Sequence, residues 1–135
     1  MEVLIDTNII LDIALQRSKF AKQSGDFLKF VSHKDYRSFL TATTITDIYY
    51  VLKKSKGHQR TIDFIGNLIL FVDVAGVTKN IVMSALTSKS PDFEDAIQAE
   101  TAKDHNIKII VTRNTSDFIN TGIKAVTPQD FVKQY

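Results

Sequence analysis

Residues 3–12 read VLIDTNIILD, and this stretch decides the fold class. Three consecutive apolar residues come first, a pattern that favours a short strand buried on both faces of a sheet. Asp6 closes the run, and apolar residues then recur between Ile9 and Leu15 at helical spacing. The stretch therefore predicts a buried strand that leads almost directly into a helix, with an aspartate at the junction.

The same alternation of strand and helix patterns continues along the chain. Strands that alternate with helices predict an α/β fold with a central, mainly parallel sheet of about five strands. Short apolar runs predict the further strands at residues 38–42, 71–74, 109–111 and 125–126. Periodic stretches predict helices at residues 18–31, 43–57, 61–70, 78–86 and 90–105, the last with Ser90 as its cap and Pro91 as its first residue, and Pro128 opens a final helix.

The composition fits one globular domain spanning residues 1–135. An apolar fraction of 44% is ordinary, and no uncharged apolar stretch reaches the ~20 residues that a membrane helix needs. No signal peptide pattern is visible, and the absence of cysteine excludes disulfides and thiol chemistry. These features predict a cytoplasmic protein without a membrane segment. The formal net charge of +2 says little by itself about nucleic acid.

Acidic residues follow the predicted strands at one edge of the sheet. Asp6 comes directly after the first strand, and Asp117 follows the strand at residues 109–111 by a few positions. Asp47 lies in the first turns of the helix that follows the strand at residues 38–42. Asp92 and Asp95 lie near the start of the helix at residues 90–105 and share one of its faces. Because ligands of parallel sheets bind beyond the carboxyl ends of the strands, we expect these carboxylates to gather there.

Such a cluster of carboxylates indicates a metal site. Carboxylates brought together repel one another and cost desolvation, so a fold keeps them together mostly when a cation neutralises them. Oxygen ligands alone suit Mg²⁺ or Mn²⁺ rather than zinc, and no pair of histidines has the spacing of a zinc site.

Helix capping is the alternative explanation for some of these acids. An aspartate at a helix start is favoured by hydrogen bonding and by the helix dipole, which accounts for Asp92 and Asp95 and, less directly, for Asp6. It accounts less well for Asp47 and Asp117. Two further acids are expected to stand apart from the cluster. Glu94 is next to Asp95 in the helix and is therefore predicted to point away from it. Asp12 is interpreted as a solvated surface, loop or cap residue.

Four segments resemble the PIN-domain family, which includes the VapC-type toxins of toxin–antitoxin pairs. Their order and spacing are more specific than any one of them, and the resemblance runs from Met1 to the final helix. It is greatest to a bacterial branch with the signature DFEDA. The segments are residues 4–12 (LIDTNIILD), 44–50 (TITDIYY), 92–98 (DFEDAIQ), 111–114 (VTRN) and, with the last, 117–118 (DF).

The resemblance implies a three-layer α/β/α fold and a Mg²⁺- or Mn²⁺-dependent ribonuclease that hydrolyses RNA with metal-activated water. Asp6 and Asp95 would bind the metal directly. Asp92 and Asp117 would complete the metal cluster, and Asp47 would join Asp6, Asp95 and Asp117 in catalysis. Many family members have glutamate where Asp47 stands, and an acid where Asn114 stands.

Other residues follow from the same resemblance. Asn8, Thr112 and Asn114 would orient the carboxylates by hydrogen bonds. Arg113, beside the expected site, is the best candidate for binding substrate phosphates, because the basic runs near Lys19 and Lys53 are also explained by solubility. The family further implies a homodimer and a small antitoxin protein as partner.

Two other functions compete with the nuclease. A Mg²⁺-dependent phosphotransfer domain of the haloacid dehalogenase type needs a second aspartate two residues after the first, where this chain has Asn8. A PIN scaffold that only binds nucleic acid or protein would not need its acids, and here they are intact.

Overall fold

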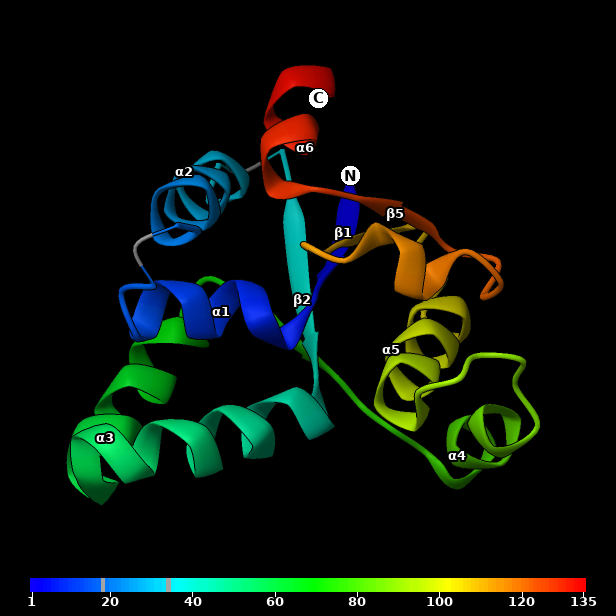
Figure 1. Cartoon of the computed structure of the whole chain (residues 1–135), viewed down its shortest axis with the longest axis horizontal. Coiled ribbons are helices and arrows are strands. Elements are labelled where there is room, and N and C mark those ends of the chain that lie inside the picture. The colour runs from blue at the N-terminus through cyan, green and yellow to red at the C-terminus, as the bar shows by residue number, and fades with distance from the viewer. Residues whose placement is uncertain (18, 34) are drawn as a thin grey trace.

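Five parallel strands form the central sheet of the computed structural model, which describes residues 1–17, 19–33 and 35–135. Every pair of neighbouring strands is parallel, and their order is β3-β2-β1-β4-β5. The predicted α/β class with a five-stranded parallel sheet is thus confirmed (Figure 1). The strands are β1 (Glu2–Ile5), β2 (Arg37–Thr41), β3 (Asp73–Ala75), β4 (Ile109–Val111) and β5 (Lys124–Val126).

Helices cover both faces of this sheet and give the expected three layers (Figure 1). One layer holds the helices that share a core with Phe27, and the other holds those that share a core with Phe118. The first contains α1 (Thr7–Ala14), α2 (Ala21–Val31), α3 (Ala42–Leu68) and α6 (Pro128–Gln134). The second contains α5 (Phe93–Asp104) and the short 3-10 helix η1 (Thr115–Phe118), and α4 (Lys79–Leu86) packs on α5 through a small separate core.

The core explains the unbroken apolar run of β1. Val3 and Ile5 are fully buried in the layer of α1, α2 and α3, whereas Leu4 is fully buried in the layer of α5. Alternate residues of a strand point to opposite faces, so a strand covered on both faces needs apolar residues at every position. The carboxyl ends of β1 and β4 are held in the interior as a result.

Several predicted boundaries needed correction. Asp92, not Ser90, is the cap of α5, and Pro91 precedes the helix instead of opening it. The predicted helix end at Gly57 is confirmed, because this residue has a positive φ of 75° and a non-helical backbone, and α3 consists of two helical segments that meet at a kink there. Position 18, the predicted start of α2, lies outside the described residues. No helix among the described residues is long and apolar enough to cross a membrane.

Candidate functional site

Asp6 lies at the point where the chain changes direction across the sheet. The chain passes from β1 to β2 on one side, and β4 adds to the other side of β1. Such a switch point leaves a crevice beyond the carboxyl ends of the two neighbouring strands, which is where parallel sheets bind ligands. Asp6 follows β1 and Thr112 follows β4, so both stand at this switch point of the sheet.

The carboxylate of Asp6 is held by side chains from two other elements. Thr112 Oγ1 donates to its Oδ2 at 2.7 Å, and Gln98 Nε2 donates to its Oδ1 at 2.9 Å. Asp6 is only 5% exposed, and although it precedes α1 its side chain makes no capping hydrogen bond. Capping therefore does not explain Asp6, whereas two fixed donors are the arrangement expected of a carboxylate with a defined task.

Sequence reasoning missed Gln98. This side chain is 1% exposed, and within the described residues its Oε1 has no hydrogen-bond partner. Its position, three residues after Asp95 in the segment 92–98, was the available signal, since residues three apart share a helix face. Gln98 thus connects α5 to the carboxylate that follows β1.

The predicted acids lie close enough to one another to perturb their ionisation. Burial, and then the negative charges of Asp92, Asp6 and Asp117, raise the pKa of Asp95 from 3.8 to about 7. Four acids, from the end of β1, the start of α5 and η1, therefore lie near one another at the switch point. Carboxylates that raise one another's pKa by mutual repulsion are typical of a cation site or a catalytic site.

Glu94 also belongs to this cluster, contrary to the prediction that it points away. The pKa of Glu94 is raised from 4.5 to about 7. Burial is the largest cause, followed by the charge of Asp47, a hydrogen bond with the Asp47 side chain, and the charges of Asp6 and Asp92. The prediction was wrong because it considered α5 alone. The first turns of α3 come close to the start of α5, so a side chain turned away from Asp95 still meets Asp47.

Capping does explain Asp92. Its Oδ1 accepts from the backbone N–H of Asp95 at 2.9 Å, and the residue is exposed. It does not explain Asp47, because Thr41 caps α3 by accepting from the Thr44 N–H at 3.1 Å. Asp92 therefore has a structural role besides any role in the cluster, whereas Asp47 has none of this kind.

The donor chemistry of the cluster fits a hard divalent cation. All its ionisable side chains are carboxylates, and their mutual repulsion is what a cation would relieve. As they stand, no three Asp, Glu or His side chains among the described residues are arranged to contact a single ion. The fit thus rests on the donor set and its charge, not on ready-made ligand geometry.

Of the residues predicted to orient the carboxylates by hydrogen bonds, Thr112 does so and Asn8 does not. Thr112 makes the expected hydrogen bond to Asp6, and its Oγ1 also accepts from the backbone N–H of Asn114 at 3.1 Å. The side-chain oxygen of Asn8 accepts from Arg17 Nη1 at 3.5 Å, and no bond from Asn8 to a carboxylate is present within the described residues. Asn8 therefore faces an arginine and not the acids.

Arg113 forms an ion pair with Asp12, which sequence reasoning had placed in solvent. Arg113 Nε lies 2.7 Å from Asp12 Oδ2, and the Asp12 side chain is completely buried. Although this separation is short, the N–H is not directed at the oxygen, so the contact is an ion pair without a proper hydrogen bond. The interpretation of Asp12 was wrong because its two partners, Arg17 and Arg113, come together only in the fold.

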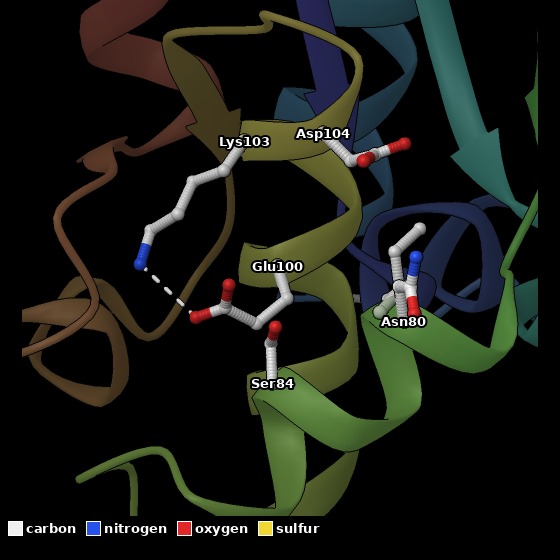
Figure 2. A pocket seen from close by; sticks show the side chains of 6 residues that line it. Asn80, Ser84, Glu100, Lys103 and Asp104 are labelled. Atoms are coloured by element: carbon white, nitrogen blue, oxygen red, sulfur yellow. Dashed lines mark hydrogen bonds and ion pairs between the residues drawn. The ribbon is translucent and has the colours of Figure 1, made fainter.

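A pocket between α4 and α5 lies apart from the candidate site (Figure 2). Lys103 Nζ donates to Glu100 Oε1 at 3.0 Å within it, so its nearest opposite charges are paired. None of the predicted site residues lines it. The lining residues are Asn80, Ile81, Ser84, Glu100, Lys103 and Asp104.

Replacing Gln98 by leucine should slow the chemistry of this site without unfolding the protein. Leucine has a similar volume and would leave Asp6 Oδ1 without a donor, so we expect kcat to fall about 10–100-fold. The buried, unpartnered Oε1 would also be removed, which limits the loss of stability. Thr101→Val, one turn further along the same buried face, is the control and should retain activity. Unchanged turnover in a folded Gln98→Leu variant would contradict the role given to Gln98.

The comparisons with known proteins agree with this geometry. The model of the PIN domain matches residues 2–116. Ribonuclease VapC1 of Aquifex aeolicus is 25% identical over 138 residues, covering 99% of this chain and 95% of that protein. The structure of VapBC2 from Rickettsia felis, bound to a DNA fragment from its promoter, has a TM-score of 0.75 at 13% identity and covers 94% of this chain and 98% of the other.

A second solved structure, VapBC-1 from nontypeable Haemophilus influenzae, has a TM-score of 0.73 at 19% identity and covers 95% of this chain and 98% of the other. These structures establish the shared fold, and the domain match covers most of the chain, including Asp6, Asp47, Asp95 and Thr112. The chain belongs to the PIN-domain family.

Proposed function

We propose that this chain is an endoribonuclease that hydrolyses phosphodiester bonds of RNA with the help of Mg²⁺ or Mn²⁺. The observation that carries the proposal is the convergence of carboxylates around the buried, doubly hydrogen-bonded Asp6 at the switch point of the sheet. The similarity to Ribonuclease VapC1 supports RNA as the substrate.

In this proposal Asp6 and Asp95 hold the ion, and Asp92 and Asp117 complete its ligands. Their crowding supports this assignment, because a bound cation would offset the repulsion that raises the pKa of Asp95. When bound, the ion would make water a better nucleophile near neutral pH and offset negative charge that develops on the phosphate. Asp47 is the remaining catalytic acid.

The other residues of the site orient these acids and the substrate. Thr112 and Gln98 fix both oxygens of Asp6, so the carboxylate needs no reorganisation when substrate arrives. Asn114 holds Thr112 through its backbone N–H. Asn8 lies two residues after Asp6, Arg113 lies between Thr112 and Asn114, and we assign both to the path of the RNA strand.

Incubation of the purified protein with labelled RNA tests the proposal. We expect cleavage in Mn²⁺ or Mg²⁺ and none in EDTA, because the acids alone do not activate water. Since water and not the ribose 2′-hydroxyl attacks phosphorus, the products should carry no 2′,3′-cyclic phosphate, and a 2′-deoxy substitution at the cleaved position should be tolerated. Cyclic phosphate ends, or full activity in EDTA, would rule out this mechanism. RNA binding without cleavage in any divalent ion would favour the non-catalytic scaffold.

We further propose that the chain is the toxin of a toxin–antitoxin pair and forms a homodimer. The fold that it shares with VapBC2 and VapBC-1 supports a protein partner. Expression of the chain alone should arrest bacterial growth, and inactivation of the acidic cluster should relieve the arrest. Light scattering of the purified chain should give the mass of two copies, and a single-copy mass at all concentrations would contradict the dimer.

A further inference from the structure

A buried aspartate with two arginines lies beside the acidic cluster. Asp12, on α1, is completely buried. Arg17 Nη1 donates to its Oδ1 at 3.1 Å, and Arg113 Nε lies 2.7 Å from its Oδ2. One carboxylate cannot neutralise two guanidinium groups, so this cluster has one positive charge in excess.

The two arginines are connected to residues that adjoin Asp6. Arg113 follows Thr112, whose hydroxyl donates to Asp6 Oδ2 at 2.7 Å. Arg17 Nη1 also reaches Asn8 Oδ1 at 3.5 Å, and Asn8 is two residues beyond Asp6. The two arginines therefore lie beside the segments that carry Asp6 and its hydrogen-bond donor Thr112 in the proposed nuclease site.

The guanidinium of Arg113 is contacted at its Nε by Asp12 and on one face by the ring of Phe20. Its Nε is buried against Asp12, and its central carbon lies 4.0 Å from the centre of the Phe20 ring. The side chain is 21% exposed, and no hydrogen bond of its terminal nitrogens is present among the described residues. With Nε buried and Phe20 against one face, the terminal nitrogens are the polar atoms left to meet a ligand.

This arrangement is a poor way to gain stability and a good way to hold a charge in place. A buried ion pair is often no more stabilising than apolar residues of the same volume, and here Nε does not even make a directed hydrogen bond with Asp12. A guanidinium fixed in one orientation, however, offers two parallel donors whose spacing matches a phosphate. Fixing it before binding reduces the ordering cost of binding.

We propose that Asp12 is a positioning residue that holds Arg113, with Arg17 beside it, as a binding site for a backbone phosphate of the RNA strand next to the cleaved bond. The inference rests on the proposed nuclease function and adds to it a defined anchor for the substrate. The contacts of Asp12 with Arg17 and Arg113, together with Phe20 stacked on Arg113, form the anchor.

Three conservative variants test this inference in the full chain. Arg113→Lys keeps the charge but loses the paired donors, and Asp12→Asn keeps the shape but releases both arginines. Arg37→Lys is the matched control, because Arg37 also contacts two carboxylates, Glu2 and Asp73, and an aromatic ring, that of Phe39. Arg37 lies at the amino end of β2, at the opposite edge of the sheet from Asp6.

The measurements are the kcat and KM of RNA cleavage in Mn²⁺, binding of a fluorescent single-stranded RNA in EDTA, and the melting temperature of each variant. We expect Arg113→Lys to raise KM about tenfold, with kcat within about threefold of wild type, because a phosphate contact away from the reacting atoms acts mainly on binding. Arg37→Lys should change neither constant.

Asp12→Asn gives the sharpest result because two explanations predict opposite signs. Removing a negative charge would strengthen RNA binding if only the net charge mattered. If Asp12 positions the arginines, binding should weaken about three- to tenfold despite the gained charge. The RNA affinity of this variant in EDTA decides between the two explanations without requiring catalysis.

The possible outcomes separate this inference from the proposed function. If the wild type cleaves RNA but Arg113→Lys and Asp12→Asn keep its KM and affinity, the cluster only joins α1 to the segment after β4 and the inference is overturned. Tighter RNA binding by folded Asp12→Asn also overturns it. If Asp12→Asn does not fold, Arg113→Lys alone decides. Failure of the wild type to cleave any RNA with any divalent ion overturns the proposed function itself.

Discussion

Asp6→Asn is expected to lower kcat for RNA cleavage by at least about 100-fold in saturating Mn²⁺. Asp6 is the carboxylate to which α5 and the end of β4 both direct a hydrogen-bond donor, and its charge influences both Glu94 and Asp95. Asparagine has the same shape, but it removes the charge and one of the two oxygens that a cation would use.

The variant should fold, which makes the loss of activity interpretable. The asparagine oxygen can still accept from Gln98 Nε2, and its NH₂ group can donate to Thr112 Oγ1, whose own hydrogen can rotate away. We therefore expect a melting temperature close to that of wild type. Asp104→Asn is the control, since Asp104 is an exposed acid at the far end of α5 and should leave kcat unchanged. Retained cleavage in folded Asp6→Asn would exclude Asp6 from the mechanism.

The strand ends of the site could be predicted from the sequence because they depend on local patterns. The apolar run before Asp6 fixes a strand that is buried on both faces, and the chain must then place Asp6 at its carboxyl end. The β-branched run before Thr112 does the same for β4. Two parallel neighbours with such residues at their ends meet at one edge, whatever the details of the helices.

The residues that sequence reasoning missed depend on contacts between distant segments. Gln98 is a polar residue within a helix until the fold brings Asp6 to it, 92 positions away in the chain. Asp12 was expected in solvent because neither of its partners, Arg17 and Arg113, stands one helical turn from it in the sequence. Its ion pairs therefore cannot be predicted from helical spacing. Glu94 was misplaced because the helix that it faces, α3, begins at Ala42. Each error concerns a charge or amide whose surroundings are formed by another element.

Asp95→Asn should abolish the proposed RNA cleavage and at the same time stabilise the metal-free protein near neutral pH. The folded-state pKa of Asp95, about 7, lies above its ordinary value of 3.8, so the folded protein binds the proton more tightly than the unfolded chain. The stability that this gives is complete below the ordinary pKa and is lost as the pH rises through 7. In EDTA, wild type should therefore melt at a lower temperature at pH 8 than at pH 5.

Asparagine carries no charge at either pH, so the advantage of Asp95→Asn should grow between pH 5 and pH 8. After allowance for solvent screening we expect about 1 kcal/mol at pH 8, or a rise in melting temperature of about 3–5 °C. The helix dipole opposes this, because an acid in the first turn of α5 is favoured by about 0.5 kcal/mol. The raised pKa indicates that repulsion and burial outweigh that gain.

The effect of Mn²⁺ on melting completes this test. At pH 8 the ion should stabilise wild type more than Asp95→Asn, because it compensates a repulsion that the variant no longer has. Calorimetry of both proteins at pH 5 and pH 8, with EDTA or with Mn²⁺, measures all these differences. A lower melting temperature of Asp95→Asn in EDTA at pH 8 would mean that Asp95 stabilises the start of α5. Equal stabilisation of both proteins by Mn²⁺ would mean that the ion binds elsewhere.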